Sequence, residues 1–257
     1  MQAFGVDIGG TGIKGAPVDL KAGRLASSRY EVATPHPGKP EDVADAVRGV
    51  VEHFGWRGPV GVAFPGVVAH GITQSAANMH PGWVGKDAAS LMAEHLDRPV
   101  VVMNDADAAG IAEMTHGAGR RRAHAALRPD SGPTIVLTLG TGIGSAVFVD
   151  DVLVPNTELG HLELDGHDAE TQASARARKA EGLSWAVWGR RLERYLAHLE
   201  MLFCPGLFVL GGGISREADR FLPLLRSIRT PVVPAELHND AGVVGAAMAA
   251  PRSQDRP

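Results

Sequence analysis

The sequence has 257 residues, of which 44% are hydrophobic and 21% are charged, and its net charge at pH 7 is −4. This composition is typical of one large or two modest globular domains, and it excludes a basic, nucleic-acid-binding surface over the whole protein. The single cysteine, Cys204, excludes an intrachain disulfide and a multi-cysteine metal site, which favours a reducing, cytoplasmic setting. We expect neither a signal peptide nor a membrane-spanning segment.

The first part of the chain alternates strand-like and helix-like segments. Apolar residues recur at helical spacing between Pro40 and Phe54, and Gly55 follows as a stop signal. The run PVVVMND at 99–105 is typical of a buried strand in a parallel sheet. The predicted elements are strands at 2–8, 16–20, 28–33, 59–66 and 99–105, and helices at 40–54 and 86–96.

The second part repeats this alternation, which predicts an α/β fold. Residues 134–139 and 144–149 are predicted to pair as a hairpin about the turn GTGIG. A strand is predicted to enter the glycines of 207–213, and short helices are predicted at 107–118 and 241–250. A long helix is predicted over 183–203, with an apolar face of Trp188, Leu192, Tyr195, Leu196, Leu199, Leu202 and Phe203.

The tetrapeptide Gly-Thr-Gly-Ile occurs twice, at 10–13 and 140–143, each time after a strand-like run. Glycine lets the backbone approach a ligand closely, and successive N–H groups in such turns bind anions. A single copy is also typical of an ordinary hairpin, but two copies and a third turn at 211–213 favour phosphate binding and an internal duplication. GxxxxGK[ST] is not present, so a Walker A loop is not expected. The run GTGIKG at 10–15 matches GxGxxG, but a short glycine motif is weak evidence by itself, and a dinucleotide fold is not expected. The candidate phosphate-binding residues are Asp7, Gly9, Gly10, Thr11, Gly12, Lys14, Gly140, Thr141, Gly142, Gly211 and Gly212.

Two carboxylates at the ends of predicted strands are candidates for the chemistry. Asp7 is placed to hold Mg²⁺ directly or through water. Asp105 follows the valine-rich strand, where ligands of α/β proteins bind, and is the candidate base for a sugar hydroxyl, with Asn104 bonding a neighbouring hydroxyl. An aspartate before an alanine-rich helix is also a common N-cap. Asp107 is predicted to take that capping role and to leave Asp105 for catalysis.

The run NTELGHLELDGHDAE at 156–170 concentrates acidic and histidine side chains. Such a cluster could ligate a metal, bond a polyhydroxylated sugar, or form a solvated loop. The residue types do not decide between these three interpretations.

Taken together, the motifs DIGGTGIKG, ND at 104–105, LGTGIG, ELGH at 158–161 and LGGG at 210–213 resemble the repressor–kinase (ROK) family of bacterial sugar kinases, over essentially the whole chain. The resemblance implies the two-lobed, duplicated, ribonuclease H-like fold of actin and hexokinase, with an active site in the cleft between the lobes. It implies a small lobe over 1–105, a large lobe over 106–240, and a final helix at 241–257 that packs back on the small lobe. It also implies a homodimer and Mg²⁺.

The family resemblance implies roles in the sugar site. Glu158 and His161 of ELGH match the residues that contact sugar hydroxyls, and Glu170 matches a further glutamate, with Glu163 as its competitor. Asn78 resembles the asparagine of the family's sugar loop, although it is equally typical of an exposed turn. Most members carry a CxCGxxGCxE zinc motif after ELGH, whereas this chain has LELDGHDAE, so structural zinc is not expected.

This zinc-free loop resembles the polyphosphate glucokinases of the family, which implies glucose as acceptor and inorganic polyphosphate as donor. The run GRRRAH suggests that Arg120, Arg121 and Arg122 form a polyphosphate patch, although three arginines are equally typical of a solvated loop. Arg128, Arg176, Arg178 and Lys179 are further basic residues in this half.

Three alternatives stay open beside this hypothesis. The first is a strictly ATP-dependent hexose kinase. The second is a non-enzymatic, sugar-sensing member of the family. Such members carry a DNA-reading domain before the phosphate motif, whereas here that motif begins at residue 5. The third, an actin-like or chaperone-like ATPase, would lack the polar cluster at 156–170.

Overall fold

The computed structural model describes residues 1–76, 79–120 and 132–250. The chain divides into two compact units, one formed by Met1–Ala112 with the C-terminal segment from Asp240, and the other by Glu113–Asn239. Each unit has its own sheet and its own apolar core. Among the helices of the described ranges, none combines the length and the apolar run that crossing a membrane requires.

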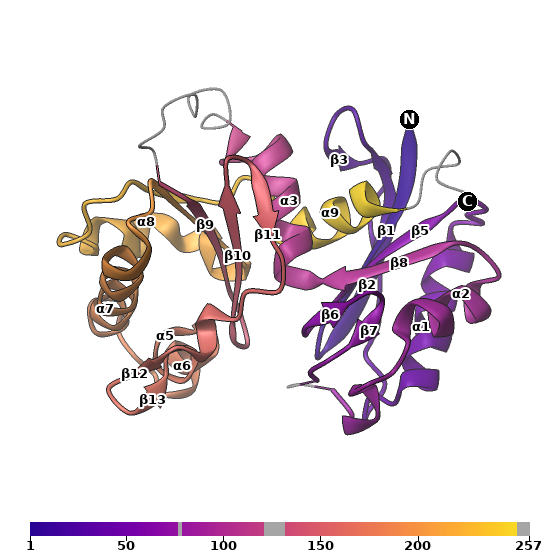
Figure 1. Cartoon of the computed structure of the whole chain (residues 1–257), viewed down its shortest axis with the longest axis horizontal. Helices are drawn as coiled ribbons and strands as arrows, with labels where there is room; N and C mark the ends of the chain where they lie inside the picture. The colour runs from indigo at the N-terminus through magenta and orange to yellow at the C-terminus, as the bar shows by residue number, and fades with distance from the viewer. Residues whose placement is uncertain (77–78, 121–131, 251–257) are drawn as a thin grey trace. The chain divides into compact units, whose positions relative to one another are not determined.

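The sheet of the first unit has the order β3-β2-β1-β5-β8, and β4 also pairs with β2 (Figure 1). Strands β1 and β2 form an antiparallel hairpin, while β5 runs parallel to both β1 and β8. The strands are β1 (Gln2–Ile8), β2 (Gly12–Asp19), β3 (Arg24–Leu25), β4 (Tyr30–Ala33), β5 (Val60–Phe64) and β8 (Val100–Asn104). Strand β8 lies at the edge of the sheet and is only half-buried, so the prediction of a fully buried strand there is wrong; the central strand β5 is buried instead.

The two faces of this sheet pack against different helices because side chains alternate along a strand. Phe4 and Val6 of β1 belong to the core that includes Val43 and Val47 of α1 (Pro40–His53). Helix α2 (Ala88–Leu96) packs beside α1. The opposite face carries Gly5, and it contacts α9 (Ala241–Ala249). The first unit also contains β6 (Val68–Ala69), β7 (Ile72–Thr73), η1 (Pro81–Trp83) and the first two turns of α3 (Asp105–His116), whose residues from Glu113 onward belong to the second unit.

Helix α9 approaches the sheet so closely that no side chain fits between them. A Cβ atom on Gly5 would lie 1.9 Å from the carbonyl oxygen of Val243, and one on Gly61 would lie 1.7 Å from that of Ala246. On the far side of the helix, a Cβ atom on Gly245 would lie 1.7 Å from the carbonyl oxygen of Ala108 in α3. Glycine is therefore required at these positions by close backbone approach.

The second unit repeats the arrangement of the first. Its sheet has the order β11-β10-β9-β14-β15, with an antiparallel β9–β10 hairpin followed by two parallel pairs. The strands are β9 (Thr134–Leu139), β10 (Ile143–Val149), β11 (Val152–Val154), β14 (Leu207–Gly211) and β15 (Val232–Pro234). The predicted hairpin about GTGIG is confirmed, and the shared strand order confirms the predicted duplication.

Helix α7 (Trp185–Phe203) covers the core of this unit with a stripe that includes Trp188, Leu192, Leu196 and Leu199. Leu202 is 51% exposed, so its predicted place in the apolar face is wrong. The steps of four and three residues along the stripe continue to Phe203, and Leu202 lies about 100° away from it. The other elements are η2 (Leu159–His161), β12 (Glu163–Leu164), β13 (His167–Asp168), α5 (Ala169–Ala173), α6 (Ala175–Ala180), η3 (Gly213–Glu217), α8 (Ala218–Phe221), η4 (Leu222–Leu224) and η5 (His238–Asp240).

The contact between α9 and the sheet predicts that Gly61→Ala destabilises the protein. The added methyl group would overlap the backbone of Ala246, and overpacking of this kind costs about 1–3 kcal/mol or more. The free energy of unfolding in urea measures the effect. Gly49→Ala is the matched control, because Gly49 lies in α1 and a Cβ atom there would have no atom from outside its own helical turn within 4 Å. At this position the added methyl group should stabilise the helix by about 0.5–1 kcal/mol. Equal stability of the Gly61 variant and the wild type would contradict the prediction.

Candidate active site

The first glycine turn joins β1 to β2 and is closed by its own backbone. The N–H of Gly9 donates to the carbonyl oxygen of Gly12 at 2.9 Å. The Thr34 hydroxyl, at the end of β4, donates to the carbonyl oxygen of Gly9 at 2.6 Å, and the Thr34 N–H donates to that of Thr11 at 3.2 Å. These bonds fix the turn while Gly10 and Thr11 stay exposed at its tip. The tip therefore presents backbone to a ligand from a fixed position.

Asp7 and Lys14 face each other across the same hairpin. They are register partners in β1 and β2, and the Lys14 Nζ lies 3.0 Å from the Asp7 Oδ2. A Cβ atom on Gly242 would lie 2.6 Å from that same oxygen, so the first turn of α9 also closes over the carboxylate. The predicted magnesium ligand is thus a half-buried carboxylate paired with the predicted phosphate-binding lysine.

The second glycine turn, between β9 and β10, has the same closure. The Gly140 N–H donates to the Gly142 carbonyl oxygen at 3.0 Å, and the Ile143 N–H donates to the Glu170 Oε2 at 3.1 Å. A Cβ atom on Gly142 would lie 2.2 Å from this Glu170 oxygen. The Glu170 carboxylate therefore packs directly beneath the turn.

The third glycine turn follows β14 and lies next to the second. Gly212 has a φ of +81°, and a Cβ atom on it would lie 2.5 Å from the carbonyl oxygen of Leu139, the residue before Gly140. The Ser215 hydroxyl donates to the Gly212 carbonyl oxygen at 2.8 Å. The second unit thus brings Gly211 and Gly212 beside the turn that contains Gly140, Thr141 and Gly142.

Asn104 and Asp105 lie where β8 passes into α3. The buried Asn104 accepts the Asp107 N–H at its Oδ1 at 2.9 Å and donates from its Nδ2 to the Gly66 carbonyl oxygen at 3.1 Å. Helix α3 begins at Asp105, so the prediction that Asp107 caps it is wrong; Asn104 has the capping side chain. The half-buried Asp105 accepts the Ala106 N–H at its Oδ1 at 2.8 Å.

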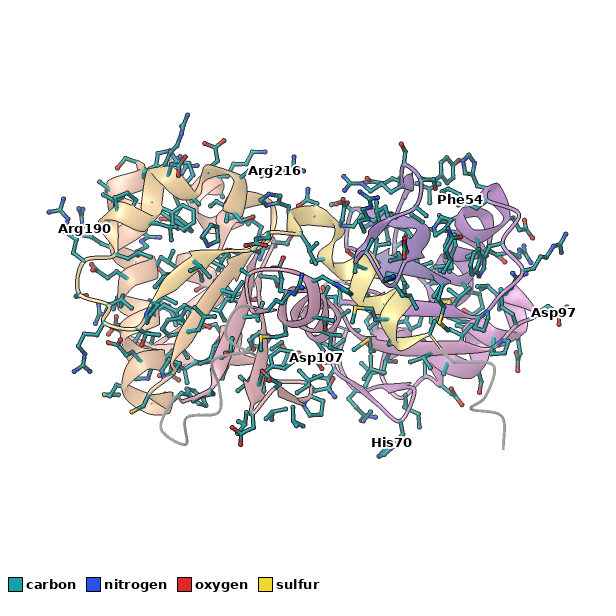
Figure 2. The ribbon with its side chains drawn as sticks, turned by 90° about the horizontal axis from the view of Figure 1, so that it is seen from above. Phe54, His70, Asp97, Asp107, Arg190 and Arg216 are labelled. Carbon is teal, nitrogen blue, oxygen red and sulfur yellow. The ribbon has the colours of Figure 1, made fainter. Side chains whose placement is uncertain are left out.

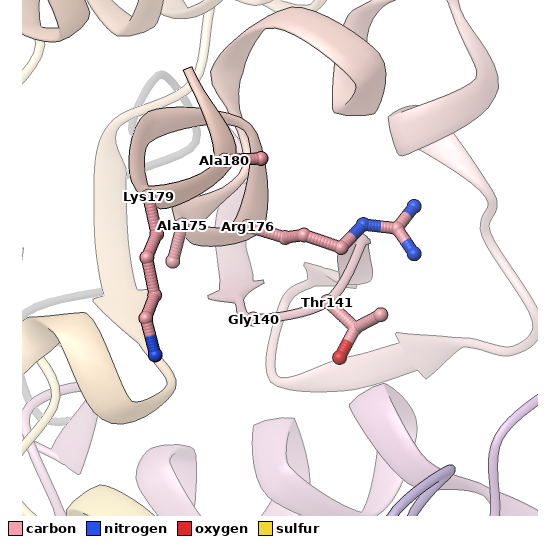
Figure 3. Close-up of a pocket in the computed structure, with 6 residues that line it drawn as sticks. All are labelled: Gly140, Thr141, Ala175, Arg176, Lys179 and Ala180. Carbon is pink, nitrogen blue, oxygen red and sulfur yellow. The ribbon is translucent and has the colours of Figure 1, made fainter. Parts of the chain in front are cut away.

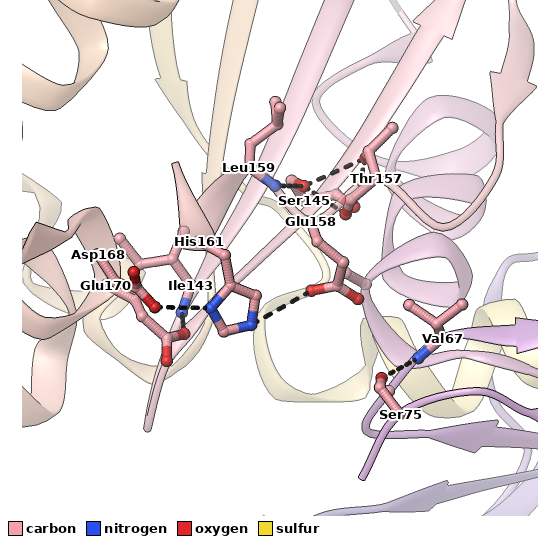
Figure 4. A network of polar contacts seen from close by, with 12 residues as sticks. Val67, Ser75, Ile143, Ser145, Thr157, Glu158, Leu159, His161, Asp168 and Glu170 are labelled. Atoms are coloured by element: carbon pink, nitrogen blue, oxygen red, sulfur yellow. Dashed lines mark hydrogen bonds and ion pairs between the residues drawn. The ribbon is translucent and has the colours of Figure 1, made fainter. Parts of the chain in front are cut away.

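The segment that carries Glu158 is held by two hydroxyl side chains that sequence analysis did not identify. The Ser145 Oγ donates to the Thr157 carbonyl oxygen at 2.6 Å and accepts the Leu159 N–H at 3.0 Å. The Thr157 Oγ1 donates to the Ser145 carbonyl oxygen at 2.9 Å (Figure 4). Ser145 is fully buried within the mainly apolar strand β10, so its hydroxyl has its partners inside the protein.

His161 links two acidic side chains in the same cluster (Figure 4). Its Nδ1 lies 3.1 Å from the Asp168 Oδ2, and its Nε2 lies 4.0 Å from the Glu158 Oε2. The hydrogen bond with Asp168 raises the pKa of His161, whereas burial raises the pKa of Glu158. Asp168 was not among the predicted site residues, because only the fold of the β12–β13 hairpin brings it to the imidazole.

The structure separates the two glutamates that competed for the third sugar contact. Glu170 points toward the turn at Ile143 and contributes to the raised pKa values of both Glu158 and His161. Glu163 is exposed on β12. The structure therefore joins Glu158, His161 and Glu170 in one cluster and leaves Glu163 outside it.

A pocket of about 540 Å³ opens beside the second glycine turn (Figure 3). It lies between that turn and α6, whose first residues are joined to the turn by a bond from the Arg176 N–H to the Gly140 carbonyl oxygen at 3.0 Å. The lining residues are Gly140, Thr141, Ala175, Arg176, Lys179 and Ala180.

Some predicted site residues lie outside the described part of the chain, namely Asn78, Arg121 and Arg122, together with Arg128. Arg120 is described, and it is exposed at the end of the segment that follows α3. Within residues 1–76, 79–120 and 132–250, no group of three or more histidine, cysteine, aspartate or glutamate side chains is arranged to hold a metal ion.

Comparison with known proteins places this site in a family context. The model of the ROK family matches residues 3–177. The polyphosphate glucokinase of Mycobacterium tuberculosis (strain CDC 1551 / Oshkosh) is 47% identical over 249 residues, which cover 96% of this chain and 91% of that protein.

Two solved structures are similar over nearly their whole length. The inorganic polyphosphate/ATP-glucomannokinase of Arthrobacter sp. strain KM is 54% identical, with a TM-score of 0.89 over 96% of this chain and 97% of that chain. The ROK family glucokinase of Streptomyces griseus, in complex with glucose and AMPPNP, is 26% identical, with a TM-score of 0.81 over 97% and 99% of the two chains. These similarities confirm the predicted fold class, the duplicated two-lobed α/β fold of actin and hexokinase.

The contact between Asp168 and His161 predicts that Asp168→Asn lowers the pKa of His161. The variant removes the negative charge that stabilises the protonated imidazole, so His161 loses its proton at a lower pH than in the wild type. NMR titration of the His161 Cε1–H resonance measures this change.

Asp165→Asn is the matched control for this titration. Asp165 lies in the turn of the same hairpin at a φ of +58°, which asparagine tolerates, and it pairs with Arg194 rather than with His161. Its substitution should leave the His161 titration unchanged. An unchanged pKa in the Asp168 variant would show that the hydrogen bond does not persist in solution.

Proposed function

The chain belongs to the ROK family, and we propose that it phosphorylates glucose to glucose 6-phosphate with inorganic polyphosphate as the phosphoryl donor. The observation that carries this proposal is the 47% identity with a polyphosphate glucokinase over 96% of the chain. The match to the ROK family model supports it further, since residues 3–177 include the first two glycine turns, Asp105 and the cluster of Glu158, His161 and Glu170.

The proposed reaction moves one phosphoryl group. The oxygen of a glucose hydroxyl attacks the terminal phosphorus, the bond from that phosphorus to the bridging oxygen breaks, and a polyphosphate shorter by one unit leaves. The Asp105 carboxylate accepts the hydroxyl proton, as in other phosphoryl transfers to alcohols. Its place at the start of α3, with one oxygen bonded to the Ala106 N–H, orients the carboxylate before the sugar binds.

The remaining polar groups have binding roles in this proposal. The Glu158 and Glu170 carboxylates accept hydrogen bonds from sugar hydroxyls, and the His161 ring donates one. Asn104 and Asn78 extend this set. Burial raises the pKa of Glu158 and makes its carboxylate a strong acceptor for a hydroxyl that replaces water. The N–H groups of the glycine turns and the ammonium group of Lys14 stabilise the charge of the transferred phosphoryl group.

The donor set fits a magnesium ion that is held mainly by the substrate. Mg²⁺ keeps several waters and is usually bound through one or two carboxylates and the phosphates of the substrate. Asp7 supplies one oxygen-donor carboxylate close to the first glycine turn, so it is the residue that would hold the ion. When bound, Mg²⁺ neutralises charge that develops on the phosphoryl oxygens.

The donor range is the finer part of the proposal. The similar Arthrobacter protein is named a polyphosphate/ATP-glucomannokinase, which supports ATP as a second donor. A strictly ATP-dependent glucokinase is the alternative, and it is supported by the more distant Streptomyces glucokinase bound to AMPPNP. We also propose that the protein is a cytoplasmic homodimer. Analytical ultracentrifugation of the purified protein would measure the number of subunits.

The donor assay tests the proposed function directly. Purified protein is incubated with glucose and Mg²⁺ and either polyphosphate or ATP, and glucose 6-phosphate is measured by its oxidation with a coupled dehydrogenase. We expect formation with polyphosphate, and loss of formation when EDTA removes Mg²⁺. Turnover with ATP alone would select the alternative, and turnover with neither donor would reject both.

Asp105→Asn should lower kcat by about 10²–10⁴-fold, because the amide cannot accept the hydroxyl proton. Glucose binding, measured by isothermal titration calorimetry, should change by less than about threefold, since the amide keeps the size and polarity of the carboxylate. Asp97→Asn is the matched control; Asp97 is an exposed residue of the same unit, at a φ of 51° after α2 (Figure 2). Near wild-type kcat in the Asp105 variant would remove this carboxylate from the mechanism.

A further inference from the structure

Two cations on α6 line the pocket beside the second glycine turn. Arg176 and Lys179 lie one helical turn apart, and both line the pocket with Gly140 and Thr141. Their side chains extend in different directions from the helix, that of Arg176 toward the side of Thr141 (Figure 3). Both are exposed, and within the described ranges neither lies within ion-pair distance of a carboxylate. Their charges are therefore available to a ligand in the pocket.

The neighbouring cations of this unit differ from these two. The guanidinium carbon of Arg178 lies 3.6 Å from the centroid of the Trp185 ring. The Arg191 guanidinium makes a two-pronged ion pair with Glu181, at 2.9 and 2.8 Å. Arg178 and Arg191 thus have structural partners that account for their place in the fold, whereas the lining of the pocket has none for Arg176 and Lys179.

The backbone fixes the pocket to the glycine turn. The Arg176 N–H donates to the Gly140 carbonyl oxygen at 3.0 Å, and the Ser174 Oγ, which caps α6, accepts the Ala177 N–H at 3.2 Å. The base of each cationic side chain therefore keeps a constant distance from the turn. A polyphosphate chain with one phosphate at Thr141 would therefore have its next units near the Arg176 and Lys179 side chains.

The chemistry of the lining selects the ligand. Among the residues that form the pocket there is no aromatic ring and no carboxylate, and the walls between the cations are the small side chains of Ala175 and Ala180. Arginine and lysine offer five and three N–H donors for oxyanions. Such a lining has no ring on which a purine could stack and no acceptor for its amino group, but it suits a narrow chain of anionic groups.

We propose that this pocket, formed by Gly140, Thr141, Ala175, Arg176, Lys179 and Ala180, binds the phosphoryl units of polyphosphate that follow the transferred unit. The inference rests on the proposed function and adds to it a site for the length of the donor. Arg176 and Lys179 bind successive units by charge-assisted hydrogen bonds, and a donor with only three phosphoryl groups makes fewer of these contacts. The pocket thereby favours long polyphosphate over a nucleoside triphosphate.

Kinetics of the double variant Arg176→Gln with Lys179→Gln test the proposal. We expect the KM for long-chain polyphosphate to rise by about 10- to 100-fold, as for the loss of one or two charge-assisted contacts, and the KM for tripolyphosphate or ATP to rise by less than about threefold. The dependence of KM on salt concentration should also become weaker with long-chain polyphosphate, because fewer ion contacts remain.

The matched control is Arg190→Gln with Arg226→Gln. It removes two positive charges from exposed residues of the same unit that do not line the pocket, and Figure 2 shows Arg190 at the surface. This variant should keep the wild-type KM for each donor. Equal effects of the two double variants would attribute the result to net charge and overturn the proposal, as would equal losses with polyphosphate and ATP in the pocket variant.

A binding measurement separates this proposal from the proposed function. Long-chain inorganic polyphosphate is titrated into the protein without glucose, and binding is followed by calorimetry. Weaker binding by the pocket variant, with unchanged binding by the control variant, supports the site. If the wild type binds polyphosphate in this way but transfers no phosphoryl group to glucose, only the proposed function is rejected. Identical polyphosphate binding by wild type and pocket variant would overturn the site.

Discussion

The close contact of α9 with the sheet of the first unit determines much of the local structure around it. The backbone of the helix rests on Gly5 and Gly61, and any side chain at either position would overlap a carbonyl oxygen of the helix. This contact brings residues from the end of the chain to strands near its beginning. It also places Gly242 against the Asp7 carboxylate, so the same packing that fixes the helix restricts where this carboxylate and its partner Lys14 can point.

The two glycine turns share a second constraint, which is a carboxylate beneath their last glycine. A Cβ atom on Gly12 would lie 2.7 Å from the Glu31 Oε1, and one on Gly142 would lie 2.2 Å from the Glu170 Oε2. The two carboxylates differ in their partners. Glu170 accepts the Ile143 N–H, whereas the Glu31 carboxylate lies 3.8 Å from Arg29, which pairs with Asp240 at 2.7 Å. The duplicated sequence GTGI therefore specifies the same turn, while residues outside the repeat give each turn its own support.

The sequence predicted the parts of the fold that depend on short-range patterns. The β9–β10 hairpin follows from apolar strands around Gly-Thr-Gly, and α1 and α7 follow from apolar residues at helical spacing. In the first hairpin, the second strand was predicted at 16–20, whereas β2 begins at Gly12. Helices α5 and α6 were missed because each is only five or six residues long, and α6 is rich in alanine, arginine and lysine without an apolar period. The pocket could not be predicted for the same reason, since one of its walls is α6.

The candidate site was predictable in its residue types and not in its pairings. The motif ELGH identified Glu158 and His161, but the bond from His161 to Asp168 depends on a two-residue hairpin, β12–β13, that has no apolar alternation to reveal it. The prediction that Asp107 caps α3 was wrong for a related reason. Asn104 and Asp107 are both good capping residues by type, and only the point at which β8 ends decides that Asn104 accepts the N–H three residues ahead.

Glu170 connects the two kinds of chemistry that the second unit carries. Its carboxylate accepts a backbone N–H of the second glycine turn. Its charge also adds to the effect of burial on the pKa of Glu158 and to the effect of the Asp168 hydrogen bond on the pKa of His161, both of which are raised. A phosphate at the turn and a sugar at the cluster would both change the field around this one group. The Glu170 carboxylate occupies the space that a side chain on Gly142 would need, so glycine at this position lets the carboxylate lie against the turn. Glu170 thus lies between the second glycine turn and the acidic cluster within a single unit.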